Sequence, residues 1–364
     1  WFGSSALRHC CDWRRTWRIL PHGPLAAGWM TGNFDVISIS SAASTGLMDL
    51  RTGQWERRML QCLAKEEYRQ LAWDQLPRIV DQFEPIGPLA EHLALEAGVS
   101  LDHRPLVFPT SDDQQAGLVG GGAVEAGQVA VVLGNSAVVN SSGRQPPQGG
   151  SLDVMRLNWG PYLWMRCYNN GAGLLHHVFG EKPPFEKLEH QAQKVPPGCQ
   201  GVSVLPFVAP EPSRRISKPC FRWVPKEPHQ GGVKFRACLE AIAYLIALGI
   251  REHEEAGQTI TRITVSGGIA RSDLMCRILA SVLGRRLERL VSDEGPALGA
   301  AVTALAALET HRRRQQGDPE PFQVADAVAV LVKFREPVDP TPEWIEPYQK
   351  GLADFEKRIQ KLAR

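Results

Sequence analysis

Several features that would place a protein in a special class are missing from this sequence. No apolar run reaches the roughly 18 residues of a membrane-spanning helix. A formal net charge of +2 gives no reason to expect a nucleic acid or an anionic membrane as partner. The eight cysteines include no CxxC pair. Scattered cysteines favour reduced thiols in the cytoplasm over a disulfide framework or a zinc site.

The segment of residues 1–19 shows no clear structural period. It is rich in Arg, Trp and Cys, and it begins at Trp1 rather than at a methionine. Basic residues are interspersed and no apolar region follows, so the segment is unlike a secretory signal. We expect it to be an unmatched N-terminal segment rather than a natural N-terminus.

The length of 364 residues allows two domains, each with its own core. Strand and helix signals alternate, which predicts an α/β fold. We expect a first domain at 20–125 and a second at 126–310. Residues 311–364 should form a charged linker, beginning HRRRQQGDPEP, and a closing helix over Glu343–Leu362.

Local patterns predict the main elements. Gln128–Leu133 is a short apolar run that is typical of a central strand, and Ala137–Asn140 resumes the strand after a tight turn. Val233–Glu255 has the period of a long amphipathic helix. Helices are also expected over Leu20–Gly32 and Trp55–Leu63.

The stretch Val265–Ala301 is the most informative part of the chain. A short strand ends in the pair Gly267-Gly268, and a helix follows from Ser272 to Gly284. A second glycine-rich helix start lies at Glu294–Ala301. Paired glycines let a ligand approach the backbone, and the N–H groups that open a helix favour polar or anionic groups. A nucleotide suits such a pair of turns.

Two further motifs bear on chemistry. Gly134-Asn135-Ser136 forms the tip of the predicted hairpin, where small donors can hold phosphate oxygens. An ordinary Gly-Asn turn is the alternative. Asp113 stands before small residues and a glycine cluster, where a carboxylate could take a proton from an attacking hydroxyl group. The alternative is a helix cap for a helix that starts at Gln114.

Together these motifs resemble the FGGY carbohydrate kinases, and xylulokinases in particular. The resemblance rests on ASTGLMDLRTGQWERRML, DQQAGLVGGGAVEAGQVAVVLGNSAVV, VSGGIARSDLMCRILASVLGRRL and DEGPALGAAVTA, and it runs from about Leu20 to the C-terminus. It implies the actin/hexokinase/Hsp70-like (ribonuclease H-like) ATPase fold, with two domains and a cleft, and with the first domain truncated.

The resemblance implies ATP-dependent phosphorylation of a sugar hydroxyl, with ATP and Mg²⁺ as cofactors and no metal ligand identified. Asp113 matches the general base and, with Gln114, the sugar contact. The ATP contacts are then Gly134, Asn135 and Ser136 for phosphate, Gly267, Gly268 and Ala270 for adenosine, and Ser272 and Asp273 at the following helix. A cytoplasmic enzyme is expected, and a homodimer is one possible assembly.

The sequence departs from the family pattern at several points. No hairpin with the family's D-x-G-T motif precedes Leu20, so most of the first half-domain is unmatched. Asn135 replaces the usual threonine of the phosphate turn, and Asp112 replaces a small residue, which could raise the pKa of one carboxyl if both were buried. Residues 209–212 replace the family's G-E-R loop, so an arginine contact is expected to be absent.

Three interpretations stay open: part of a complete sugar kinase, a degenerate relative that binds nucleotide or sugar without turnover, or a subunit completed by a separate N-terminal chain. The pattern favours a pentulose such as xylulose, with gluconate, ribulose and glycerol as alternatives. Part of the cleft could be lined by Trp159, Trp164, Tyr168, Asn169 and Asn170, although a buried helix with aromatic packing is the alternative for the tryptophans.

Overall fold

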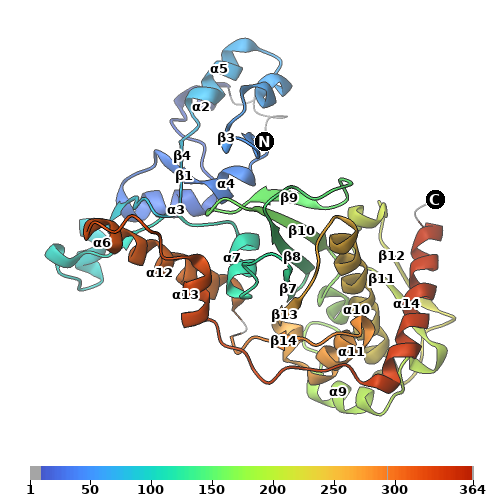
Figure 1. Cartoon of the computed structure of the whole chain (residues 1–364). Coiled ribbons are helices and arrows are strands. Elements are labelled where there is room, and N and C mark those ends of the chain that lie inside the picture. Colours follow the sequence, from blue (N-terminus) through green and yellow to red (C-terminus); the bar gives the residue numbers. More distant parts are fainter. Residues whose placement is uncertain (1–9, 293, 363–364) are drawn as a thin grey trace. The chain divides into compact units, whose positions relative to one another are not determined.

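A computed structural model describes residues 10–292 and 294–362. The chain forms two compact units, both of mixed helix and strand (Figure 1). The first unit contains the residues up to Ala116 together with Met155–Leu163 and Gly299–Val330. The second contains Gly117–Val154, Trp164–Leu298 and the residues from Leu331 onward. The predicted α/β class is confirmed.

A six-stranded sheet with the order β14-β13-β7-β8-β10-β9 lies mainly in the second unit. The strands are β7 (Gln128–Leu133), β8 (Ala137–Gly143), β9 (Asp153–Arg156), β10 (Tyr162–Tyr168), β13 (Arg262–Ser266) and β14 (Glu288–Arg289). Strand β7 runs parallel to β13 and antiparallel to β8. The predicted central strand is confirmed with its bounds, and β8 continues three residues beyond the prediction, to Gly143.

Helices and a small sheet complete the second unit. They are α8 (Gly173–Phe179), α9 (Phe185–Gln193), η3 (Cys199–Gly201), β11 (Ser203–Phe207), η4 (Pro212–Arg214), β12 (Cys220–Val224), α10 (Gly231–Glu255), η5 (Gly268–Arg271), α11 (Asp273–Leu283) and α14 (Pro342–Leu362). The closing helix is confirmed, and it starts one residue before the prediction.

Helix α10 is the centre of the second unit. We predicted one apolar face, but every residue from Phe235 to Ile250 is buried. The helix contacts β8, and it also contacts α9, α11, β11 and α14 (Figure 1). The expectation of a solvent-facing side was therefore wrong, because other elements of the unit cover the polar stripe as well.

The first unit contains short elements. They are α2 (Cys10–Arg15), α3 (His22–Thr31), β1 (Val36–Ser38), α4 (Ile39–Ala43), β2 (Met48–Asp49), β3 (Gln54–Trp55), η1 (Arg57–Cys62), α5 (Glu66–Asp74), β4 (Arg78–Val80), β5 (Gly87–Pro88), α6 (Glu91–Glu96), η2 (Leu101–His103) and β6 (Leu106–Val107). Helix α3 ends at Gly32, whose left-handed φ of 81° closes it as predicted. The helix expected over Trp55–Leu63 is a 3₁₀ helix, η1.

Three helices lie wholly or partly in segments of the first unit, and they alter the predicted domain bounds. They are α7 (Asp113–Gly120), α12 (Gly295–Gln315) and α13 (Val324–Leu331). The HRRRQ run at 311–315 is the last turn of α12 rather than a linker. The guanidinium of Arg314 lies over the ring of Phe83, which joins this helix to the rest of the unit. Residues 299–330 therefore group with the first unit rather than with 126–310.

The burial of α10 predicts a large effect for a core truncation. Ile246 is fully buried, so Ile246→Ala should lower the free energy of unfolding by about 2–5 kcal/mol and Ile246→Val by about 0.5–1.5 kcal/mol. Urea unfolding followed by circular dichroism measures both. Equal and small losses would show that this side of α10 is not packed as described.

Candidate functional site

The turn Gly134–Ser136 joins β7 to β8. Its carbonyl oxygens are held by the protein: the N–H of Ala172 donates to Gly134 (2.8 Å) and that of Gly171 to Asn135 (3.0 Å). Among the described residues, the backbone N–H groups and side chains of Asn135 and Ser136 have no hydrogen-bond acceptor. Free donors at a turn are what phosphate oxygens need. This geometry supports the predicted phosphate turn.

Gly171 is a residue of this site that the sequence analysis missed. A Cβ atom at Gly171 would lie 2.7 Å from the carbonyl oxygen of Gly134 and 2.8 Å from that of Ser136. Real Cβ atoms essentially never come so close, so only glycine fits here. The run of small residues after Asn170 was the available signal.

A buried carboxylate holds the segment that precedes Gly171. Glu211 is 1% exposed, and its Oε2 accepts the backbone N–H of Asn169 (2.9 Å) and the Nδ2 of Asn170 (3.0 Å). The side chain of Asn170 in turn accepts the N–H of Ala209 (2.9 Å). A buried carboxylate with several donors fixes its neighbours firmly. Glu211 therefore supports the phosphate turn through the segment 169–172.

The loop around Glu211 is anchored by an arginine from another position. Pro212 replaces the family arginine, but Arg214 donates to the hydroxyl of Tyr168 and pairs with Glu252 at 2.8 Å. Burial raises the pKa of Tyr168 well above its usual range. The hydroxyl therefore stays protonated and serves as a fixed polar contact.

The aromatic segment near this loop is a strand, not a helix. Trp164 and Tyr168 lie in β10 and are buried, at 5% and 0% exposure. The indole N–H of Trp164 donates to the carbonyl of Gln145 (3.0 Å). Both side chains therefore belong to the packing of the sheet, whereas Asn169 is exposed and Trp159 is half-buried. The alternative of a buried helix was wrong, although its aromatic packing is present.

Gly267 places the glycine pair that follows β13 beside the turn Gly134–Ser136. It has a left-handed φ of 93°, and a Cβ atom there would lie 2.6 Å from the carbonyl oxygen of Leu133, the residue before the turn. Nothing lies within 4 Å of a Cβ built at Gly268, so the backbone is open there. The second glycine-rich helix start, at Gly295, also lies near the end of β13, because a Cβ atom there would lie 3.4 Å from Ser266 Oγ. The glycines therefore gather at the carboxyl ends of β7 and β13.

Two N–H groups at the start of α11 are bound by the protein itself. Ser272 caps the helix through the N–H of Met275 (3.0 Å), and its hydroxyl donates to Glu189 (2.9 Å). The same carboxylate accepts the N–H of Leu274 (3.1 Å). Glu189 of α9 and the cap thus occupy the N–H groups of Leu274 and Met275, whereas a ligand contact at Asp273 stays a prediction. Sequence offered no signal for this partner.

The other two predicted adenosine contacts differ in exposure. Ala270 is 7% exposed and belongs to the core of the second unit. The side chain of Asp273 is 75% exposed and forms an ion pair with Arg289. Asp273 thus lies at the surface, whereas the methyl group of Ala270 is packed inside.

Adjacent carboxylates at the start of α7 have different surroundings. Asp112 Oδ1 accepts the N–H groups of Gln114 (2.8 Å) and Gln115 (3.0 Å). Asp112 is therefore the helix cap, and the capping alternative for Asp113 does not apply. Asp113 is exposed, and its Oδ2 accepts the Nε2 of Gln114 at 3.2 Å. This leaves Asp113 available for chemistry.

A buried polar network fixes the position of Asp112. The hydroxyl of Ser40 donates to its carboxylate, while the N–H of Ser40 donates to Asn158 Oδ1 (2.8 Å). Asn158 is tied to α7 by its own N–H, which donates to Gln115 Oε1 (2.7 Å). Burial raises the pKa of Asp112, and the charge of Asp113 adds to the rise. The pKa of Asp112 is therefore raised, and its burial contributes more to this rise than the neighbouring carboxylate of Asp113 does.

Within residues 10–292 and 294–362, no group of three or more His, Cys, Asp or Glu side chains could hold a metal ion. In the same part of the chain, no helix combines the length and the apolar character of a membrane span.

Comparison with known proteins identifies the second unit. Residues 130–308 match the C-terminal domain of the FGGY family of carbohydrate kinases. The second unit is therefore similar to the C-terminal domain of these kinases. A ligand-bound xylulose kinase from Lactobacillus acidophilus aligns with 94% of this chain and 67% of its own, at a TM-score of 0.79 and 19% identity. The fold is therefore the actin/hexokinase-like fold of these kinases.

Curated proteins that are similar to this chain include xylulose kinases and gluconokinases. A xylulose kinase of Haemophilus influenzae is 24% identical over 298 residues, which cover 79% of this chain and 58% of the relative. A gluconokinase of Bacillus subtilis is 25% identical over 294 residues, covering 75% of this chain and 55% of the relative. The chain thus spans little more than half the length of these relatives.

We expect the loss of Asp112 and the loss of Asp113 to have different effects on stability. Asp112→Ala should lower the free energy of unfolding by about 1 kcal/mol because the cap is lost, whereas Asp113→Ala should change it by less than about 0.5 kcal/mol. Urea unfolding of both variants makes the comparison. A larger loss for Asp113→Ala would contradict the assignment of the cap.

The two glycines that follow β13 form a second matched pair. Gly267→Ala should destabilise the protein by more than about 2 kcal/mol, because it combines a left-handed φ with a backbone clash. Gly268→Ala meets no neighbour and should change stability by less than about 1 kcal/mol. Thermal unfolding of the two variants measures the difference. Similar melting temperatures would refute the close approach of Gly267 to Leu133.

Proposed function

We propose that this protein transfers the terminal phosphoryl group of ATP to a hydroxyl group of a sugar, with a pentulose such as xylulose as the acceptor. The observation that carries the proposal is the turn Gly134–Ser136, whose free donors lie beside the open backbone of Gly268 in one rigid set of strands. The FGGY domain at residues 130–308 supports it, as does the likeness to xylulose kinases.

Each part of the site has a role in this reaction. The N–H groups and side chains of Asn135 and Ser136 bind phosphate oxygens, and the glycines at 267–268 give room for the adenosine. Positioning and charge neutralisation dominate phosphoryl transfer, so a rigid phosphate turn is the main requirement. Ser272 and Ala270 shape the protein beneath this surface rather than contacting the nucleotide, because their polar and apolar groups are already engaged.

Asp113 acts as the general base. Its exposed carboxylate takes the proton as the sugar oxygen forms its bond to phosphorus, and the bond from that phosphorus to the ADP oxygen breaks with its electron pair. Gln114 lies beside this carboxylate and contacts the sugar through its amide. Asp112 cannot share the role, because its carboxylate is engaged with Ser40 and the start of α7.

Mg²⁺ would accompany ATP in this reaction. Mg²⁺ in kinases keeps water and phosphate oxygens and needs only one or two carboxylates from the protein. When bound, the ion neutralises charge on the phosphates.

Gluconate is the second candidate acceptor, because the Bacillus subtilis gluconokinase is as similar to this chain as the xylulose kinases are. Ribulose and glycerol follow from the family pattern alone. Binding of nucleotide or sugar without turnover is the alternative function, and it is favoured by the replacements at Asn135 and Pro212.

The role of Asp113 is tested with a matched pair of variants. Asp113→Asn should lower the rate of ADP formation with xylulose at least about 100-fold, because a general base contributes about 10²–10⁴-fold, while the affinity for ADP changes less than about twofold. Asp112→Asn keeps the cap and serves as the control.

The assay compares xylulose, ribulose, gluconate and glycerol, and it uses both the 364-residue chain and a form that includes any upstream in-frame codons. Retained turnover in Asp113→Asn would remove Asp113 from the mechanism. ADP binding without turnover on any acceptor, in either form, would favour the binding-only alternative.

A further inference from the structure

A cavity of about 360 Å³ lies within the second unit, and the proposed kinase site does not use it. Its walls come from the segment 197–204, from α10 and from α14; we call it the α10–α14 cavity. None of its lining residues belongs to the turn 134–136 or to the segment 267–273. Its size is at the lower end of the range of about 300–1,000 Å³ that small-molecule sites occupy.

The floor of the α10–α14 cavity carries a buried carboxylate. Glu240 is 3% exposed, and its Oε1 accepts Arg236 Nε (3.1 Å), the N–H of Gly198 (3.1 Å) and the hydroxyl of Tyr348 (3.2 Å). The weak S–H donor of Cys199 also contacts this carboxylate. Because the three hydrogen bonds from N–H and O–H donors all end at Oε1, Oε2 keeps the capacity to accept a hydroxyl group.

Arg236 makes this floor electrically neutral. Its guanidinium is fully buried, lies 4.5 Å from the ring centroid of Trp344, and donates to the hydroxyl of Tyr348 (2.7 Å) and the carbonyl of Ala192 (3.3 Å). A charge pair of this kind cancels most of the field of Glu240. The floor thus accepts hydroxyl groups without repelling an anion elsewhere on the ligand.

One wall of the cavity has an unusual backbone. Four successive residues have left-handed φ values: Gly198 at 77°, Cys199 at 49°, Gln200 at 57° and Gly201 at 86°. Left-handed non-glycine residues cost about 1–3 kcal/mol each and persist where the surrounding structure holds them, often beside a ligand. In this conformation the N–H of Gly198 donates to Glu240, which holds the carboxylate in place at the floor of the cavity.

The rim carries charged side chains that form no ion pair among the described residues. Lys350, Asp354 and Arg358 line the cavity at intervals of one turn along α14. None of the three forms an ion pair with another residue of the described chain, and Arg358 contacts only the hydroxyl of Ser203. With two cations and one anion, the rim has a formal charge of +1. Unpaired cations over a cavity favour an anionic group.

We propose that the α10–α14 cavity binds a small polyhydroxylated molecule that carries one phosphate or carboxylate group. Lys350 and Arg358 hold the anionic group at the rim, and Glu240 accepts hydroxyl groups at the floor. The rings of Tyr244 and Phe355, which also line the cavity, pack against the carbon–hydrogen face of the molecule. The site is independent of the proposed phosphoryl transfer.

Isothermal titration of the 364-residue chain with glucose 6-phosphate tests the site, with glucose and inorganic phosphate as matched probes. Glucose 6-phosphate should bind at one site and at least about tenfold more tightly than either probe. Arg358→Ala and Lys350→Ala should each weaken it at least about fivefold.

Lys357→Ala is the control, because this exposed cation of α14 does not line the cavity. It should change the affinity less than about twofold. Gly268→Ala, on the nucleotide side, should also leave binding unchanged, which separates this site from the kinase site. Melting temperatures establish that each variant is folded.

Several results would overturn the proposal. They are the lack of saturable binding by glucose 6-phosphate at millimolar concentration, equal affinity in the Arg358→Ala and wild-type proteins, and a loss of affinity in Gly268→Ala equal to that in Arg358→Ala. Equal binding of inorganic phosphate would contradict recognition of the hydroxylated body. Equal binding of glucose would contradict recognition of the anion.

Discussion

The close approach of Gly267 to the backbone of Leu133 is the constraint on which the candidate site depends. It brings the end of β13 against the end of β7, and so places the open glycine backbone beside the turn Gly134–Ser136. Any side chain at 267 would force these strand ends apart, because the space is less than a Cβ atom needs. Two motifs that lie more than a hundred residues apart in sequence thereby form one surface.

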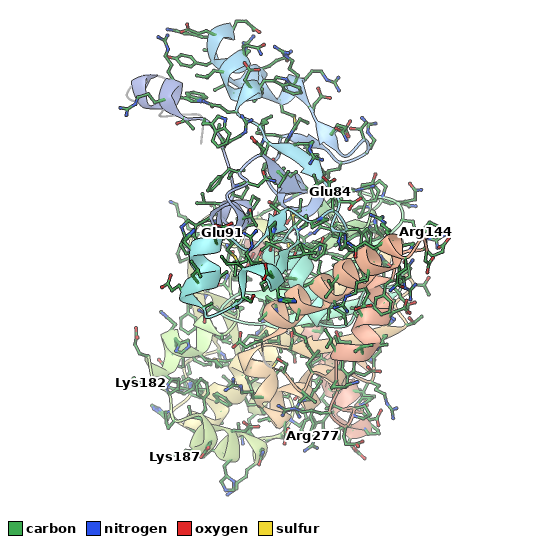
Figure 2. The ribbon with its side chains drawn as sticks, turned by 90° about the vertical axis from the view of Figure 1, so that its left-hand side faces the viewer. Glu84, Glu91, Arg144, Lys182, Lys187 and Arg277 are labelled. Carbon is green, nitrogen blue, oxygen red and sulfur yellow. The ribbon has the colours of Figure 1, made fainter. Side chains whose placement is uncertain are left out.

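The turn itself is held from outside its own hairpin. Gly171 and Ala172 bind its carbonyl oxygens, and Glu211 fixes the segment that precedes them. The N–H groups of Asn135 and Ser136 have no acceptor among the described residues. Side chains on the surface of the same unit, such as Lys182 and Lys187 near the start of α9 (Figure 2), are exposed and take no part in this support. A few buried polar contacts therefore hold the turn in place, and the charged surface side chains do not.

The structural features that depend on a local sequence pattern could be predicted. The bounds of β7, the glycine end of α3 and the glycine turn after β13 follow from neighbouring residues, and all are present. Contacts between distant segments could not be predicted: Glu189 meets Ser272 across 83 residues, and Glu211 meets Asn169 across 42. The burial of every residue from Phe235 to Ile250 in α10 escaped prediction for the same reason. Sequence offered Asp113 as the possible cap of α7, and the hydrogen bonds at the start of this helix assign the cap to Asp112 instead.

The central claim is that the turn Gly134–Ser136 binds the phosphates of a nucleotide beside Gly268. Amide chemical shifts of the ¹⁵N-labelled protein, recorded on addition of ADP and of adenosine, test it residue by residue. The account predicts that ADP shifts the amides of Asn135, Ser136 and Gly268, and that adenosine shifts Gly268 but leaves the two turn residues unchanged. Saturation with ADP that leaves Asn135 and Ser136 unshifted would contradict it.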